Sequence, residues 1–276
     1  MKRIKPRVGI FGLTGCAGDQ LVILNCEDEL VDLASRIEIV KFGMASSAGD
    51  LEGRLDLAIV EGSVCTQRDL DLLLNVRSKS AALLAIGTCA VWGGIPAMRN
   101  ELPLELLQKL VYEGKDLDEI NLEQAHPVSD FVPVDFAVPG CPIEKEEFLN
   151  TLIAILQRTT PERHDYSVCS ECRIAENLCL VKTRGIVCCG PISAGGCKAR
   201  CPSLGVPCYG CRGPVDEPHY DATAQLFSEH GLSKADVIEQ IQRYSAPAWV
   251  NHHLRREWAE DPERRGRQRI PSSESA

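Results

Sequence analysis

Short apolar runs alternate with amphipathic segments through the first 160 residues of the chain. Five runs lead into turns containing Gly or Pro, which predicts strands within 7–13, 37–44, 55–64, 81–90 and 134–142; the last two segments include the start of the loop GTCAVWGGIPA and the turn PGCP. Apolar residues at helical spacing predict helices at 21–37, 66–80, 101–114 and 143–158. Thr66 is the expected N-cap of the second helix. Strands that alternate with helices predict an α/β protein with a doubly wound parallel sheet.

Three cysteines come shortly after predicted strands, in loops that contain Gly or Pro. Cys16 lies in TGCAGD, Cys89 in IGTCAVWGG and Cys141 in VPGCPIE. Because the carboxyl ends of parallel strands share one edge of the sheet, we expect these thiols to meet there and hold a metal centre. Three buried structural cysteines are the alternative. Cys26 and Cys65 lack this placement and are expected to be structural.

All of the remaining cysteines lie in a window of 43 residues. Nine of the fourteen lie between positions 169 and 211, with C-x2-C hooks and neighbouring prolines. They form two sets of four, with Cys189 left over: Cys169, Cys172, Cys179 and Cys188, then Cys197, Cys201, Cys208 and Cys211. Four thiolates per set match the needs of a 4Fe–4S cluster, so the window predicts two clusters and electron transfer. A disulfide framework and two structural zinc sites are the alternatives.

Composition narrows the classes of function. A chain of 276 residues is long enough for two domains. The net charge of −9 and the aromatic content of 5% argue against binding to nucleic acid or to an anionic membrane. The N-terminal segment lacks the apolar core of a signal peptide, and no apolar run reaches the length of about 18 residues typical of a membrane span. Together with the many cysteines, this predicts a cytoplasmic protein.

Four motifs resemble the small subunit of nickel–iron hydrogenases: TGCAGDQL, IVEGSVCT, LAIGTCAVWGGIPA and VPGCPIEKEEF. The cysteine-rich segment is similar to the delta subunit of cytoplasmic, NAD(P)-linked hydrogenases, also called sulfhydrogenases. The wider family includes the cluster-bearing small subunit of respiratory complex I. The resemblance implies a flavodoxin-like domain over 1–160 with a proximal cluster, a ferredoxin-like domain over 161–215 with two clusters, and a helical extension with a polar tail over 216–276.

The resemblance also assigns ligands to three 4Fe–4S clusters. It implies that Cys16, Cys89 and Cys141 hold the proximal cluster, with Asp19 in place of the usual fourth cysteine. The medial set is Cys197, Cys201, Cys208 and Cys211; the distal set is Cys169, Cys172, Cys179 and Cys188. Cys169 stands where the family commonly has a histidine, and Cys201 completes a medial set that often has three cysteines. Asp19 as a helix cap is the alternative to ligation, and Cys189 is able to exchange roles with Cys188.

The function implied by the resemblance is an electron-relay subunit of a hydrogenase. Its expected partners are a nickel–iron catalytic subunit and subunits that carry flavin, NAD(P) and further iron–sulfur clusters. No G-x-G-x-x-G loop follows a strand, so the chain itself is not expected to bind nicotinamide or to hold a catalytic residue. Glu61 is a candidate proton relay, with a salt-bridged or capping role as the default. A ferredoxin-like carrier, or a cluster subunit of another oxidoreductase related to complex I, is the alternative function.

Overall fold

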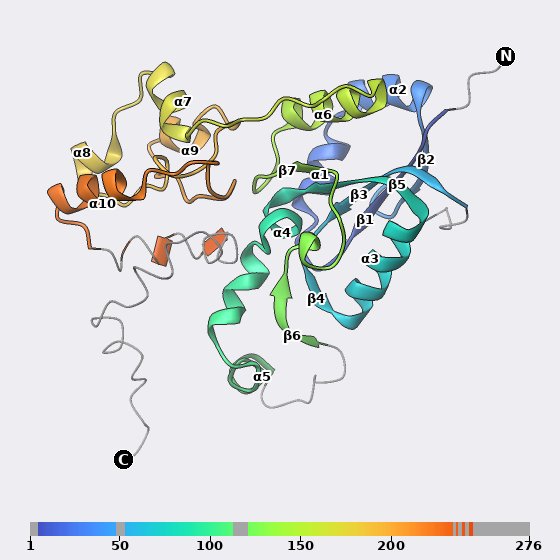
Figure 1. Ribbon diagram of the computed structural model, residues 1–276, viewed down its shortest axis with the longest axis horizontal. Helices are drawn as coiled ribbons and strands as arrows, with labels where there is room; N and C mark the ends of the chain where they lie inside the picture. The colour runs from blue at the N-terminus through green and yellow to red at the C-terminus, as the bar shows by residue number, and fades with distance from the viewer. Residues whose placement is uncertain are drawn as a thin grey trace.

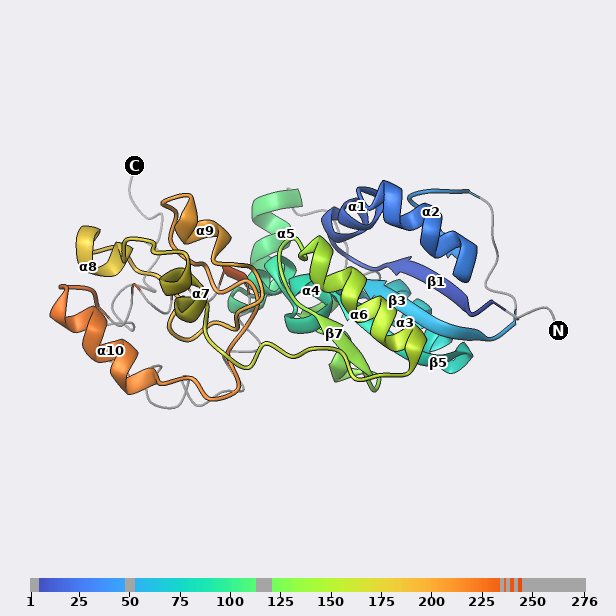
Figure 2. The same ribbon diagram turned by 90° about the horizontal axis from the view of Figure 1, so that it is seen from above.

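A computed structural model describes residues 5–47, 53–112, 121–233, 236, 239–240 and 243–244. It shows two parts side by side along the longest axis (Figure 1, Figure 2). One part is a sheet covered by helices, and the other is a set of short helices joined by loops. Within the described ranges, no helix combines the length and the apolar character needed to cross a membrane.

The central sheet has five parallel strands in the order β2-β1-β3-β5-β7. Its strands are β1 (Arg7–Gly12), β2 (Glu38–Phe42), β3 (Leu55–Glu61), β5 (Ser80–Ile86) and β7 (Phe136–Val138). All five predicted strands are therefore present. Because β4 and β6 lie outside this sheet, renumbering its five strands in chain order gives the strand order 2-1-3-4-5. This is the strand order of flavodoxin-like folds, which confirms the predicted fold class.

Helices cover both faces of the sheet, as the doubly wound prediction requires (Figure 2). One face packs against α1 (Gly18–Leu24), α2 (Glu27–Arg36) and α6 (Lys145–Gln157), and the other against α3 (Gln67–Lys79) and α4 (Gly87–Trp92). Successive residues of a strand serve opposite cores: Ile59 packs on the first face and Val60 on the second. This is why the strands read as nearly continuous apolar runs.

Local sequence signals explain how two of these helices begin. Thr66 caps α3 as predicted: its hydroxyl accepts the Asp69 N–H at 3.1 Å, and the Asp69 carboxylate accepts the Thr66 N–H at 3.0 Å. The helix predicted over 21–37 is instead two helices, because the chain turns at Asn25 and Cys26. The second helix begins with three acidic residues, which suit the positive end of a helix dipole.

Several smaller elements lie beyond the carboxyl edge of the sheet. They are β4 (Val64–Thr66) paired with β6 (Asn121–His126), the 3-10 helices η1 (Ile95–Glu101) and η2 (Val128–Asp130), and α5 (Leu104–Tyr112). The β4–β6 pair is antiparallel and was not predicted. The helix predicted over 101–114 begins three residues later in the structure, at Leu104.

The cysteine-rich part contains α7 (Val168–Ile174), α8 (Leu180–Arg184), α9 (Arg200–Ser203) and α10 (Tyr220–Glu229). Its small core joins Val168, Cys189, Ile192 and Phe227. Phe227 comes from α10, so the start of the predicted extension packs on this core. The second helix of that extension falls mostly outside the described residues, and the division at 160 and 215 stays a prediction.

Candidate metal centres

The three cysteines predicted at the carboxyl edge of the sheet do come together there. Cys16 follows β1, Cys89 lies on α4 directly after β5, and Cys141 follows β7. Burial raises the pKa of Cys141 to about 12, and the charges of neighbouring groups, Cys16 and Cys89 among them, add to the effect. Burial likewise raises the pKa of Cys89 to about 11. Cys89 is partly buried, whereas Cys16 and Cys141 are exposed, so the three thiols share a site that opens to the surface. Soft thiolate donors suit an iron–sulfur cluster there.

Asp19 is buried at the same site, with 6% of its surface exposed. Its Oδ1 accepts the Ile143 N–H at 2.8 Å. The N-cap position of α1 belongs to Ala17, so Asp19 is not the cap of this helix, which was the predicted alternative to iron ligation. Burial raises its pKa to about 6, against the lowering effect of the Ile143 N–H. Asp19 therefore ties α1 to the loop that carries Cys141.

Glu61 is the buried acid beside this site, and its contacts are structural. Its carboxylate accepts Gln20 Nε2 at 2.6 Å and also the backbone N–H of Asp19. Burial raises the pKa of Glu61, and these two hydrogen bonds partly oppose the rise. It therefore satisfies a backbone donor in the first turn of α1, which is the capping role expected by default.

Two glycines make room for the candidate ligands. A Cβ on Gly87 would overlap the carboxylate of Asp19, and one on Gly94 would lie 2.7 Å from Cys89 Sγ. Both have positive φ angles, 78° and 57°, which glycine adopts at little cost. The glycines of the GTCAVWGG loop thus allow the backbone to approach the site closely.

The four cysteines predicted for the distal cluster also lie together. Cys169 and Cys172 are on α7, Cys179 is the N-cap of α8, and Cys188 is in the loop that follows. Burial raises the pKa of Cys169 to about 12, with further contributions from the charges of the other three. Backbone N–H groups of Gly190 and Cys208 donate to Cys188 Sγ, the latter at 3.2 Å.

The four cysteines predicted for the medial cluster line one cavity. Its walls include Cys197, Cys201, Cys208, Cys211 and Cys141. The Cys141 N–H donates to Cys211 Sγ, so this cavity adjoins the site at the sheet edge. The four predicted medial cysteines face this cavity together with Cys141, and four thiols are a donor set that fits a 4Fe–4S cluster.

Three cysteines lie outside these sets. Cys189 is fully buried in the core of the cysteine-rich part, and its N–H donates to the Cys208 carbonyl at 2.8 Å. Cys26 and Cys65 are buried in the α/β part, as expected of structural cysteines. Among the residues that the structure describes, no group of three or more His, Cys, Asp or Glu side chains is arranged to hold one metal ion.

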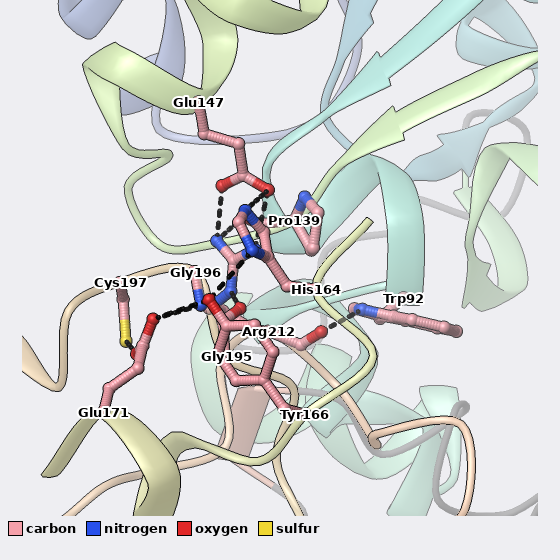
Figure 3. A network of polar contacts seen from close by, with 10 residues as sticks. All are labelled: Trp92, Pro139, Glu147, His164, Tyr166, Glu171, Gly195, Gly196, Cys197 and Arg212. Atoms are coloured by element: carbon pink, nitrogen blue, oxygen red, sulfur yellow. Dashed lines mark hydrogen bonds and ion pairs between the residues drawn. The ribbon is translucent and has the colours of Figure 1, made fainter. Parts of the chain in front are cut away.

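An arginine network, which the sequence did not indicate, joins the two parts of the molecule (Figure 3). Arg212 is 3% exposed, and its guanidinium donates to both carboxylate oxygens of Glu147 at 2.8 and 2.7 Å. It also donates to the carbonyls of Pro139, at 2.8 Å, and of Gly195. Burial alone lowers the pKa of Arg212, but the hydrogen bonds and charge of Glu147 raise it overall.

Comparison with known proteins identifies the class. The family model of the NADH ubiquinone oxidoreductase 20 kDa subunit matches residues 16–155. The solved structure of an NAD+-reducing NiFe-hydrogenase in the H2-reduced state aligns with a TM-score of 0.52 and 29% identity, over 58% of this chain and 95% of that chain. The chain is thus an oxidoreductase subunit of the hydrogenase small-subunit class, and membership of this class implies iron–sulfur clusters.

Curated relatives narrow the class further. Sulfhydrogenase 2 subunit delta of Pyrococcus furiosus is 44% identical, over 87% of this chain and 99% of its own length. The matching subunit of the vhu F420-non-reducing hydrogenase of Methanococcus voltae is 32% identical, over 88% of this chain and 96% of its own length. The chain belongs to the family of small (delta) subunits of nickel–iron hydrogenases, as the sequence motifs predicted.

Proposed function

We propose that the chain is the electron-relay subunit of a nickel–iron hydrogenase. It carries electrons between a nickel–iron catalytic subunit and a module that reduces NAD(P) through flavin. The proposal includes three 4Fe–4S clusters, which when bound supply one-electron transfer. Their proposed ligands are Cys16, Asp19, Cys89 and Cys141, then Cys197, Cys201, Cys208 and Cys211, and finally Cys169, Cys172, Cys179 and Cys188. We place the protein in the cytoplasm.

One observation carries this proposal: backbone hydrogen bonds link the three cysteine sets in series. The Cys141 N–H donates to Cys211 Sγ, which joins the proximal set to the medial set. The Cys208 N–H donates to Cys188 Sγ at 3.2 Å, which joins the medial set to the distal set. Electrons entering at the sheet edge would thus have an unbroken line of neighbouring sites.

The residues of the chain would bind the three clusters and shield them from water. Cysteine side chains bind the irons, and backbone N–H groups aimed at the sulfurs stabilise their negative charge. Apolar neighbours such as Val168 and Ile192 are buried beside the sites and exclude water. The C-x2-C hook of α7 brings Cys169 and Cys172 to one side of the distal site.

Purification of an affinity-tagged chain tests the function. A relay subunit should co-elute with a larger nickel-bearing protein, and H2 should then reduce the iron–sulfur centres, seen by electron paramagnetic resonance. A free ferredoxin-like carrier would elute alone. A complex with iron but without nickel, in which H2 reduces nothing, would favour the complex I-related alternative that the family model's description suggests.

A further inference from the structure

Arg212 lies where the cysteine-rich loops meet the carboxyl edge of the sheet. Its backbone directly follows Cys211, a candidate medial ligand. Its guanidinium reaches Glu147 on α6 and the carbonyl of Pro139, two residues before Cys141. A third contact goes to the carbonyl of Gly195, two residues before Cys197. The Arg212 side chain thus fixes the backbone within two residues of three candidate ligands.

The backbone around Arg212 is fastened to the helix that carries Cys89. The Thr88 hydroxyl donates to the Cys211 carbonyl at 2.5 Å, and Trp92 Nε1 donates to the Arg212 carbonyl at 2.9 Å. Both donors lie on α4, on either side of Cys89 in sequence. The same short segment is therefore tied to the loop after β7, to α4 and to α6 of the α/β part.

Two glycines allow the backbone to approach the side chains of Arg212 and Trp92 closely. A Cβ on Gly196 would overlap Arg212 Nη2, and one on Gly213 would overlap Trp92 Nε1. Both glycines have positive φ angles, 105° and 77°. Any other residue at either position would combine backbone strain with displacement of a hydrogen-bonded group.

We propose that Arg212 is a positioning residue that fixes the medial site against the proximal site. Its contacts with Glu147, Pro139, Gly195 and Trp92, here called the Arg212 clamp, hold the cysteine-rich loops on the sheet edge. The positioning follows from the geometry of the chain alone. Its consequence for electron transfer rests on the proposed function.

The clamp requires arginine rather than any cation. A guanidinium presents five N–H donors in a planar fork, and here they serve a bidentate carboxylate and two carbonyls. A lysine keeps the charge but cannot make this set of contacts at once. Because the pair is buried, removing the charge of Glu147 would leave the guanidinium without a counter-charge.

The chain offers a matched control at a surface pair. Arg163 Nη2 lies 2.9 Å from Asp216 Oδ2, but these side chains are 77% and 62% exposed. Such pairs contribute little to stability. R163K therefore makes the same chemical change as R212K, without a clamp to break.

The test uses the full chain purified with its partner subunits. The N–H groups of residues 194–196 donate to Gly213, Tyr166 and Glu171, beside the Gly195 carbonyl that Arg212 holds. Amide hydrogen exchange of residues 194–196 should quicken roughly tenfold in R212K and roughly 100-fold in E147Q, and stay at the wild-type rate in R163K. Iron and sulfide per chain should not change in any of the three. In the reduced protein, the magnetic coupling between two neighbouring clusters should weaken in R212K and E147Q, because that coupling falls steeply with distance.

Two results would overturn the proposal. One is unchanged exchange and unchanged coupling in both R212K and E147Q. The other is loss of about four irons per chain in R212K, which would make Arg212 part of the medial site itself. If R212K does not accumulate, W92F removes only the hydrogen bond to the Arg212 carbonyl, and it should still quicken exchange roughly fivefold. Absence of iron and sulfide from the wild type would instead refute the proposed function, and the exchange measurement would still decide on the clamp.

Discussion

Replacing Asp19 tests whether this residue is a cluster ligand or only a structural carboxylate. Its Oδ1 accepts the Ile143 N–H at 2.8 Å, and the Ile143 residue is 1% exposed. In D19A that N–H loses its partner, which costs about 1–3 kcal/mol. In D19N an amide oxygen can still accept the bond, and the loss is roughly half as large because a neutral acceptor is weaker. Stability should therefore fall more in D19A than in D19N.

Cluster content should respond differently if Asp19 binds iron. Neither Ala nor Asn supplies a carboxylate, so both variants should lose one iron per chain and show a 3Fe–4S signal. D19C should keep the full cluster, since thiolate is the usual ligand, and its reduction potential should fall because thiolate donates more electron density. Iron analysis and electron paramagnetic resonance of anaerobically purified protein measure both effects.

A second carboxylate in the α/β part provides the control. Asp69 accepts the Cys65 and Thr66 N–H groups at 3.1 and 3.0 Å and lies in no candidate metal site. D69N should lower stability and leave the iron content unchanged. If D19N retains its full iron content and wild-type spectra, Asp19 is a structural bridge to Ile143 and leaves the ligand set.

Three further predictions concern other positions. C201A should convert one 4Fe–4S signal into a 3Fe–4S signal. C189A should keep the full iron content, and its unfolding free energy should fall by about 1 kcal/mol because the substitution leaves a small cavity. The reverse pattern of spectra would make Cys189 the ligand and Cys201 the structural cysteine. T66A should lower the unfolding free energy by about 1 kcal/mol, because α3 loses its cap, and unchanged thermal melting would refute this. The raised pKa of Glu61 means that the native state binds its proton more tightly, so stability is lost as pH rises through that pKa. Relative to wild type, E61Q should therefore be more stable at pH 7 than at pH 4, and a pH-independent difference between their melting temperatures would contradict the burial argument.

Local signals in the sequence were enough to predict much of the fold. Apolar runs marked the five parallel strands, and Thr66 with Asp69 marked the start of α3. Loops after strands brought Cys16, Cys89 and Cys141 to one edge because parallel strands end together. These features depend on a few neighbouring residues and on one general rule of topology.

Other features depend on contacts between distant residues and left no local pattern. Arg212 pairs with Glu147 across 65 positions, and only the folded chain brings them together. Asp19 resembled a helix cap because it is an acid near a helix start, yet Ala17 holds the N-cap position in a left-handed conformation. The turn at Asn25 interrupts a segment whose apolar spacing continues through it, so periodicity alone predicted one helix.

Iron and acid-labile sulfide per chain test the central claim most directly. Twelve proposed ligands in three sets of four predict about twelve iron and about twelve sulfide in anaerobically purified protein, with little zinc. Protein that contains zinc and no sulfide would contradict the account, since thiolate sets that bind zinc cannot relay electrons.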